Sequence, residues 1–299
     1  MSLKLENVTK RFGAFTAVDD LSLEIPSNGI YGFLGANGAG KTTTFRMILG
    51  LLDPSKGSIR WEGRPINYET SPYIGYLPEE RGLYPKLKAK DQAVYLARLR
   101  GMDKISAEKE WKKWLDRFQV LQYEKKRVEE LSKGNQQKIQ FITAVLHKPK
   151  LLILDEPFSG LDPLNVELLK KAVHDLNNSG TTIVFSSHRM EHVEELCEHI
   201  CIMQKGSMVL SGSLREIKRS FGKKNISIAA DFSLDYLKEF PGVLKWKKTS
   251  EGALLQVEAE KAGQPILESL IGKGVVRKFS IEEPSLNDIF IEKVGLSYE

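Results

Sequence analysis

The sequence predicts an α/β protein whose large first domain is followed by a smaller α+β domain. Three observations lead to this fold class. Residues 30–49 have the pattern of a strand, a glycine-rich loop and a helix in succession. The apolar run at 151–154 is unbroken, which is typical of a parallel strand that is buried on both faces, and residues 181–185, which are β-branched or aromatic, predict another buried strand. From residue 225 onward, short strand and helix patterns alternate without any glycine-rich loop.

Composition limits the classes of protein that the chain can belong to. Its 299 residues are many for a single core, and 41% hydrophobic with 28% charged residues is ordinary for a globular protein. No apolar run is long enough to cross a bilayer and no signal-peptide pattern is present, so we expect a cytoplasmic protein. The net charge of +5 is spread among acids, so we expect no nucleic-acid partner, while attraction to an anionic membrane surface stays open. Cys197 and Cys201 indicate buried thiols rather than a metal site.

The stretch from Gly35 to Thr42, with the sequence Gly-Ala-Asn-Gly-Ala-Gly-Lys-Thr, is typical of a phosphate-binding P-loop. Its glycines let the backbone turn tightly and aim N–H groups inward, and the helix that follows adds its positive N-terminal end. We expect Lys41 to reach the phosphates and the Thr42 hydroxyl to bind Mg²⁺. A merely structural turn would not need Gly, Lys and Thr at this spacing. The expected nucleotide-binding residues here are Gly35, Ala36, Asn37, Gly38, Ala39, Gly40, Lys41, Thr42 and Thr43.

Two carboxylates, Asp155 and Glu156, come directly after the apolar run 151–154. In open α/β sheets, ligands bind at the edge formed by the carboxyl ends of the strands. Asp155 can hold Mg²⁺ there and Glu156 can polarise an attacking water. The alternative is a pair of acids that only cap the next helix.

His188 follows the predicted strand 181–185 and the serine pair 186–187, which places it at the same edge of the predicted sheet. There it can donate a hydrogen bond to a terminal phosphate. Residues 188–192 also match the zinc pattern H-x-x-E-H. That pattern needs both histidines on one helix, whereas only His192 is expected to be helical, so the phosphate role is preferred.

Phe12 and Glu79 each allow two interpretations. Phe12 stands in an exposed turn between predicted strands at 3–12 and 20–25, where its ring can cover an adenine or simply pack. Glu79 opens a Gly/Pro-rich loop after the predicted strand 73–77, which is either a binding loop or an ordinary connection.

A polar loop at 131–137 precedes the predicted helix 139–147. It places Ser132 and free backbone N–H groups at a helix N-terminus, which is a possible second phosphate site. A plain helix cap is the alternative. The region from 88 to about 130 is charged and helical in pattern, with apolar residues on one face.

The C-terminal segment has the order of a split βαβ, or ferredoxin-like, domain. We place its start at 221, after a first domain of residues 1–220 that includes a helical subdomain at about 86–148. A last helix is expected at 284–294. The predicted strands are 226–230, 243–247, 253–258 and 275–281, and the predicted helices between them are 234–240 and 265–271.

Together these motifs occur in the order of an ATP-binding-cassette (ABC) ATPase, which the first two-thirds of the chain resembles. The chain is similar in particular to ATPase subunits of bacterial exporters of the sodium-extrusion and drug-resistance type, whose tails end in a segment like 284–290. The resemblance implies a P-loop NTPase fold with a mixed-sheet core, an antiparallel β subdomain and a helical subdomain. The motifs are Phe12, the P-loop, Leu131-Ser132-Lys133-Gly134-Asn135, the run ending in Asp155-Glu156, Ser159-Gly160-Leu161-Asp162 and His188.

The resemblance also implies how the residues act. Two cassettes, either two copies or this chain and a paralogue, would close head to tail, with each ATP between the P-loop of one and the loop 131–136 of the other. An integral-membrane permease encoded as a separate chain would be the transport partner, which places the protein on the inner face of the cell membrane. Phe12 would stack on adenine and Asp155 would support the metal. The remaining implied residues are Glu156 as base, His188 at the terminal phosphate, Asp162 as coupling residue, and Ser132, Gly134 and Asn135 at the partner's ATP.

Two departures from the family pattern affect the predicted site. Glu79 stands where a glutamine usually faces Mg²⁺ and the attacking water, so we expect a metal and catalytic role for a carboxylate there. Lys133 and Asn135 replace a glycine and a glutamine in the signature loop, while Ser132 and Gly134 are kept.

Two rival functions within or beside this superfamily are weaker. Members that act in translation usually join two cassettes, and those in DNA maintenance insert long coiled coils, whereas this chain shows one cassette and no such insertion. A regulatory module that only holds nucleotide would not need Glu156 or His188, because both roles belong to turnover.

Overall fold

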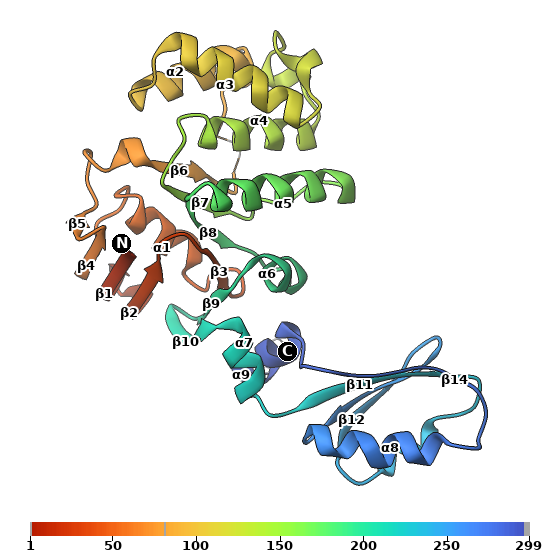
Figure 1. Ribbon diagram of the computed structural model, residues 1–299. Helices are drawn as coiled ribbons and strands as arrows, with labels where there is room; N and C mark the ends of the chain where they lie inside the picture. Colours follow the sequence, from red (N-terminus) through yellow and green to blue (C-terminus); the bar gives the residue numbers. More distant parts are fainter. Residues whose placement is uncertain (1, 81, 296–299) are drawn as a thin grey trace. The chain divides into compact units, whose positions relative to one another are not determined.

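The computed structural model describes residues 2–80 and 82–295, which form two compact units. The first unit ends at Gly212 and the second begins at Ser213 (Figure 1). The sequence-based boundary, after residue 220, lies one short helix further along, at the end of α7 (Leu214–Ser220). Within the described residues, no helix combines the length and apolar character needed to span a membrane.

A six-stranded sheet forms the centre of the first unit, in the order β10-β9-β3-β8-β7-β6. Strands β6 to β9 and β3 pair in parallel, so the carboxyl ends of β3, β7 and β8 share one edge. Residues 151–155 and 182–186 are all buried, as expected for these two strands. The strands are β3 (Ile30–Leu34), β6 (Ile74–Leu77), β7 (Leu151–Asp155), β8 (Thr182–Ser186), β9 (His199–Gln204) and β10 (Ser207–Ser213).

An antiparallel sheet, β2-β1-β4-β5, makes up the second layer of this unit. The hairpin of β1 and β2 continues to the turn at 13–14, so β2 begins at residue 15 rather than at 20 as the sequence predicted. Alternating apolar residues of β1 and β2 face helix α1 (Lys41–Ile48) in one core cluster. The strands are β1 (Ser2–Phe12), β2 (Phe15–Pro26), β4 (Lys56–Trp61) and β5 (Arg64–Pro65).

Helices α2, α3 and α4 form the predicted helical subdomain, and they lie together in Figure 1. Trp111, Phe118 and Phe141 are fully buried in it. Helix α4 begins at Lys133, not near 139, because Ser132 caps it by accepting a hydrogen bond from the Asn135 N–H. Besides α1, the described α-helices of the unit are α2 (Ala89–Leu99), α3 (Lys104–Arg117), α4 (Lys133–Val145), α5 (Pro163–Asn178) and α6 (Met190–Leu196).

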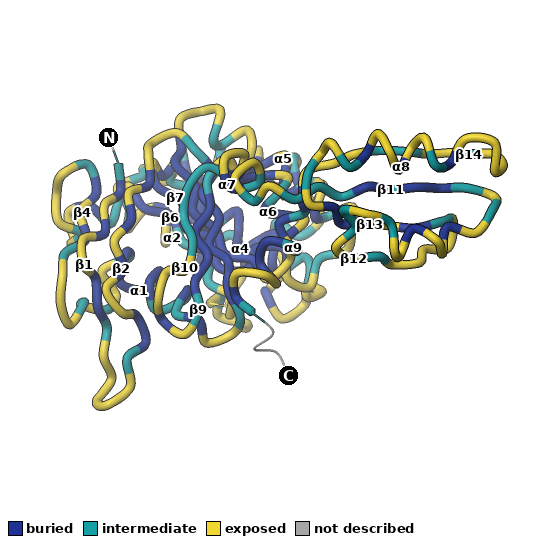
Figure 2. The backbone as a smooth tube through the Cα atoms, turned by 90° about the horizontal axis from the view of Figure 1, so that it is seen from below, coloured by how far each residue is buried: buried dark blue, intermediate teal, exposed yellow. Residues whose placement is uncertain are grey.

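The second unit is an antiparallel sheet, β12-β13-β11-β14, with helix α8 packed on it. This strand order is that of the split βαβ plan, and the buried part of β11 is visible in Figure 2. The predicted helix 234–240 is wrong in type: it is a 3₁₀-helix at Asp235–Glu239, held short between Ser233, which accepts from the Asp235 N–H, and Pro241. The other elements are β11 (Lys224–Ala230), β12 (Val243–Lys248), β13 (Gly252–Val257), α8 (Gly263–Leu270), β14 (Val276–Glu282) and α9 (Leu286–Val294).

Candidate functional site

The loop between β3 and α1 can be built only with glycine at two positions. Gly35 and Gly40 have φ angles of 154° and 104°. A Cβ atom at Gly35 would lie 2.5 Å from the carbonyl oxygen of Met203, and one at Gly40 would lie 2.7 Å from that of Ala17. No side chain caps the start of α1, which leaves N–H groups of its first turn for an anion.

Lys41 places a buried ammonium group inside this loop. Its side chain is folded back, and Nζ donates to the carbonyl oxygens of Gly35 at 2.7 Å and Ala36 at 3.1 Å. Burial lowers the pKa of Lys41, and the carboxylates of Glu156 and Asp155 act in the opposite direction. The loop therefore holds a cation at its centre, with hydrogen bonds that an anionic group can replace.

Asp155 is fixed by two hydroxyl groups at the end of β7. Thr42 Oγ1 donates to Asp155 Oδ2 at 2.9 Å, and Ser186 Oγ donates to Asp155 Oδ1 at 2.5 Å. Ser186 also accepts from the Glu156 N–H at 3.0 Å. The sequence analysis did not single out Ser186, although its place at the end of the strand next to β7 was a signal for it.

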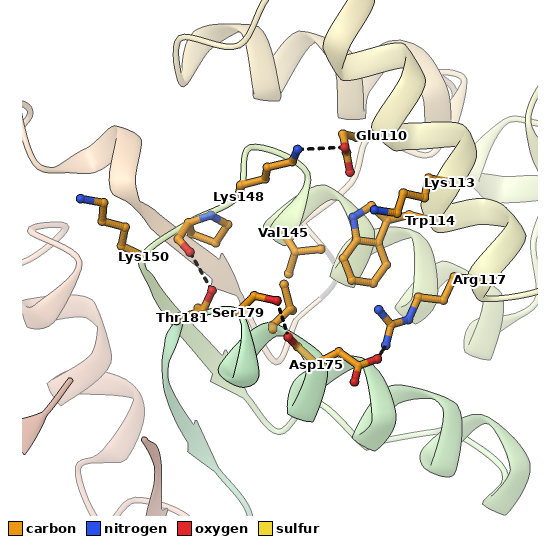
Figure 3. Close-up of a pocket in the computed structure, with 13 residues that line it drawn as sticks. Glu110, Lys113, Trp114, Arg117, Val145, Lys148, Lys150, Asp175, Ser179 and Thr181 are labelled. Carbon is orange, nitrogen blue, oxygen red and sulfur yellow. Dashed lines mark hydrogen bonds and ion pairs between the residues drawn. The ribbon is translucent and has the colours of Figure 1, made fainter. Parts of the chain in front are cut away.

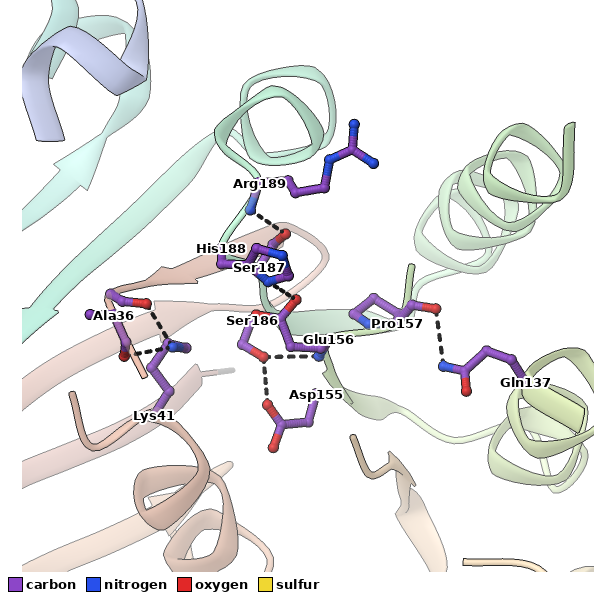
Figure 4. Close-up of polar contacts among 11 residues, drawn as sticks. Ala36, Lys41, Gln137, Asp155, Glu156, Pro157, Ser186, Ser187, His188 and Arg189 are labelled. Carbon is purple, nitrogen blue, oxygen red and sulfur yellow. Dashed lines mark hydrogen bonds and ion pairs between the residues drawn. The ribbon is translucent and has the colours of Figure 1, made fainter. Parts of the chain in front are cut away.

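Glu156 and His188 form a pair at the same sheet edge (Figure 4). His188 Nδ1 lies 2.9 Å from Glu156 Oε2, and the glutamate side chain is only 10% exposed, against 62% for the histidine. Burial raises the pKa of Glu156, and the hydrogen bond from His188 partly offsets this rise. Glu156 also has a positive φ of 49°, which turns the chain sharply after the strand.

A cavity of about 410 Å³ opens over the loop and the two carboxylates, and His188 is not among the residues that line it. Glu79, Asp155 and Glu156 line it together with Lys41, so the residues predicted to hold metal and water meet around one space. Phe12 does not line it; Phe15, which faces Phe12 across the β1–β2 hairpin, does. The other lining residues are Ala17, Asn37, Gly38, Ala39, Gly40, Thr42 and Thr43.

Ser132, Gly134, Asn135 and Asp162 do not line this cavity. Ser132 caps α4, and Asp162 caps α5 by accepting from the Asn165 N–H at 3.0 Å. A Cβ atom at Gly134 would lie 3.6 Å from the Leu161 side chain, so the starts of these two helices are neighbours. The structure thus forms two separate clusters of predicted site residues.

Two glutamines of α4 connect the helical subdomain to the cavity, and the sequence analysis missed both. Gln137 Nε2 donates to the Pro157 carbonyl at 3.1 Å (Figure 4). Gln140 Nε2 donates to the carbonyls of Pro78 and Glu80 at 3.2 and 3.1 Å, and so holds the loop that carries Glu79. Their spacing of three on a helix was the only sequence signal for them.

The zinc pattern at 188–192 is not formed on one helix. Helix α6 begins at Met190, which leaves His188 outside it. His192 is buried, and its ring lies 4.5 Å from the Phe158 ring. The two histidines therefore have separate surroundings, as the strand before His188 predicted.

Comparison with known proteins decides the family. Residues 18–159 match the protein family described as "ABC transporter", and residues 212–294 match "ATP-binding protein DrrA1-3-like, C-terminal domain". A Bacillus subtilis (strain 168) protein, described as "Uncharacterized ABC transporter ATP-binding protein YhaQ", is 65% identical over 99% of this chain and 100% of its own length. This chain belongs to the family of ABC transporter ATP-binding proteins. It is therefore an ATPase subunit of a transporter, as the motif order predicted.

Other relatives agree with this ABC assignment. The "Bacitracin transport ATP-binding protein BcrA" of Bacillus licheniformis is 33% identical over 98% of this chain and 97% of its own. A solved "Structure of ATP binding subunit of ABC transporter" matches with a TM-score of 0.70 and 28% identity, over 74% of this chain and 93% of that one. The predicted P-loop NTPase fold of ABC type is confirmed.

The raised pKa of Glu156 predicts a pH-dependent gain in stability for Glu156→Gln. A carboxyl whose pKa is raised by folding stabilises the protein below its ordinary pKa of 4.5, and this stabilisation is lost as the pH rises through the folded value. Glutamine does not ionise, so the variant does not lose stability in this way. Without nucleotide, the melting temperature of Glu156→Gln should exceed that of the wild type at pH 7.5, and the difference should shrink toward pH 4.

Scanning fluorimetry across this pH range measures the difference, with Glu251→Gln as the control because that side chain is exposed. A difference that stays constant from pH 4 to 7.5 would show that the Glu156 carboxylate carries no burial cost.

Proposed function

We propose that this ABC ATPase is the motor subunit of an exporter, in which two cassettes bind two Mg-ATP molecules between them and drive a separate membrane permease. The observation that carries the proposal is the single cavity around which Lys41, Thr42, Asp155 and Glu156 meet. A loop that only shaped the backbone would not bring a buried cation, a hydroxyl and two carboxylates to one space.

The residues present suit Mg-ATP. Gly35 and Gly40 adopt positive φ angles and lie against backbone carbonyls where a Cβ atom would not fit, which allows the tight turn that a phosphate-binding loop needs. The Thr42 hydroxyl and the Asp155 carboxylate, 2.9 Å apart, are the hard oxygen ligands that Mg²⁺ prefers. When bound, the ion neutralises charge on the phosphates. Lys41 would exchange its bonds to the Gly35 and Ala36 carbonyls for the phosphate oxygens.

Glu156 has the properties of a general base. Its raised pKa brings the carboxylate closer to neutral pH, which makes it a better proton acceptor for an attacking water. The 2.9 Å contact with His188 holds the carboxylate in one orientation. Ser186 fixes the backbone at this position through the Glu156 N–H. Glu79, from the loop held by Gln140, would add a further oxygen ligand near the metal.

A second cassette would complete the site. Ser132, Gly134 and Asn135 stand at the start of α4 and do not line this chain's own cavity. A helix start suits a phosphate because the N–H groups of its first turn have no partners within the helix, and Ser132 accepts from only one of them, that of Asn135. The partner's ATP would supply the phosphate. Asp162, in the neighbouring loop, would couple the two sites.

The direction of transport is proposed from the relatives. One is named for bacitracin transport, another, from Cupriavidus metallidurans (strain ATCC 43123 / DSM 2839 / NBRC 102507 / CH34), for Nod factor export, and a third, from B. subtilis (strain 168), for linearmycin resistance. The first two are similar to this chain over 98% of its length, including the second unit. An export function with the ATPase on the inner face of the membrane fits all three names.

One aromatic ring of the β1–β2 hairpin should stack on the adenine. Phe12 and Phe15 are 50% and 64% exposed, so alanine at either position should leave the fold intact. We predict that Phe12→Ala weakens ATP binding at least fivefold, since stacking on a base is worth about 1–3 kcal/mol. Binding of inorganic triphosphate should not change, and Phe12→Trp should bind ATP like the wild type.

Phe15→Ala is the matched control for this calorimetric measurement. If it alone weakens ATP binding, then the stacking ring is Phe15 and the prediction for Phe12 is wrong. If Phe12→Ala unfolds the protein, Phe12 is a packing residue.

Glu156→Gln tests the motor itself. The substitution keeps the shape of the side chain and removes its charge, so hydrolysis should fall by at least about 10²-fold, as for the loss of a general base. Nucleotide affinity should survive, because Glu156 is not a phosphate ligand. Since ATP would join two cassettes, the variant should elute as a dimer with Mg-ATP and as a monomer with ADP in size-exclusion chromatography.

Wild-type ATPase rates in this variant would remove Glu156 from the mechanism. A hydrolysis-deficient variant that binds ATP yet never dimerises with it would contradict the shared site.

A further inference from the structure

A second cavity, of about 330 Å³, lies between the helical subdomain and the sheet core, and the ATPase mechanism does not use it. Its walls come from α3, from the C-terminal ends of α4 and α5, and from the segments 148–150 and 179–181 (Figure 3). The cavity volume lies within the range of small-molecule sites. We propose that this cavity binds a small aromatic anion, that is, an apolar ring system with one carboxylate, sulfonate or phosphate group.

The apolar part of the cavity suits a flat ring. Trp114, Val145 and Leu176 supply apolar side chains from three different helices. Trp114 is held in place because its ring packs on Phe118 and Phe141, with centroids 5.9 Å apart in both cases. The Arg117 guanidinium lies 5.0 Å from the centre of this ring, so a ligand ring would stack on the part of the rigid indole that the guanidinium leaves uncovered, at low entropic cost.

The charged part of the cavity favours an anion. Four basic side chains and two carboxylates line it, and both carboxylates are already paired. Glu110 lies 2.9 Å from Lys148, and Asp175 pairs with Arg117. In the described part of the chain, no carboxylate lies within 4 Å of the Lys113 ammonium. The remaining basic residue, Lys150, points away from the other lining residues in Figure 3, and its ammonium lies 5.4 Å from the centre of the Tyr73 ring.

The C-terminal ends of α4 and α5 lie at the cavity, but they do not cancel its preference for an anion. Helix C-termini carry partial negative charge on carbonyl groups that lack a partner. Here those groups are engaged: the Lys148 N–H donates to the Val145 carbonyl at 2.9 Å, and the Ser179 hydroxyl donates to the Asp175 carbonyl at 2.7 Å. The Thr181 N–H donates to the Leu176 carbonyl at 3.1 Å.

The position of the cavity links it to the ATP site of the proposed function. Helix α4 has the loop at Ser132 at one end and a cavity wall, Val145, at the other. Helix α5 likewise begins at Asp162 and ends beside the cavity at Asp175 and Leu176. A ligand that fixes the C-terminal ends of both helices also fixes the spacing of the two loops that would complete the partner's site. The ligand would therefore modulate turnover.

Binding is tested with the fluorescent aryl sulfonate 1-anilinonaphthalene-8-sulfonate (ANS), in saturating Mg-ADP so that the nucleotide cavity is filled. Lys113→Glu should weaken ANS binding about tenfold or more, the size of one charge-assisted contact. Lys112→Glu, at a neighbouring position on α3 that is also exposed but does not line the cavity, should bind like the wild type. The uncharged analogue N-phenyl-1-naphthylamine should not distinguish the three proteins. Equal ANS affinity in Lys113→Glu and Lys112→Glu would overturn the site.

The effect of the cavity ligand on ATP turnover rests on the proposed function, and the ATPase rate measures it separately from binding. ANS at saturation should change the ATPase rate of the wild type at least twofold, and that of Lys113→Glu not at all at the same concentration. If ANS binds as predicted and the rate does not change, the link between the cavity and the ATP site is wrong. If the wild type has no ATPase activity, the proposed function fails, while the binding result still decides whether the cavity is a site.

Discussion

The buried ammonium of Lys41 is the constraint on which the rest of the first unit depends. A cation is costly to bury unless hydrogen bonds and opposite charges surround it. Here two carbonyl oxygens of the loop itself accept its hydrogen bonds, and the carboxylates of Asp155 and Glu156, at the end of β7, act on its charge from the same sheet edge. The loop can close around the side chain only because Gly35 and Gly40 lie against other backbone segments without a Cβ atom. The cation thus fixes both the loop and the sheet edge opposite it.

The sheet brings site residues together, whereas the helices keep two groups of residues apart. Strands β3, β7 and β8 bring the loop, the two carboxylates and His188 to one edge by their parallel order. Helix α4 carries the loop at Ser132, which does not line this chain's cavity, at its first turn. Further along the same helix, Gln137 and Gln140 bind the backbone of the segments that carry Glu156 and Glu79. Helices α4 and α5 then extend from the starts that carry these loops to the second cavity at their C-terminal ends. This arrangement is why we treat that cavity as a place where turnover can be modulated.

Sequence reasoning succeeded where a local pattern determines the structure. The glycine-rich loop, the buried strands 151–154 and 181–185 and the acids after the first of them were all placed correctly, because each depends on a few adjacent residues. Sequence reasoning failed where residues outside the local pattern determine where an element begins and ends. Strand β2 is longer than predicted because pairing with β1 continues it, and the 3₁₀-helix at Asp235–Glu239 is short because Ser233 and Pro241 bound it. The sequence places Ser186 at the end of a strand, but its pairing with Asp155, like the pairing of Phe15 with Phe12, depends on strand register, which the sequence alone does not state.

The central claim, that the Lys41 ammonium is held for a phosphate group, is tested most directly by calorimetric titration of ATP into Lys41→Ala. The substitution removes a charge-assisted contact worth about 1.5–3 kcal/mol, so the affinity should fall roughly ten- to a hundredfold. Lys56→Ala, at an exposed position of β4, should bind ATP like the wild type. Circular dichroism should show that both variants are folded. Unchanged ATP affinity in folded Lys41→Ala would contradict the account.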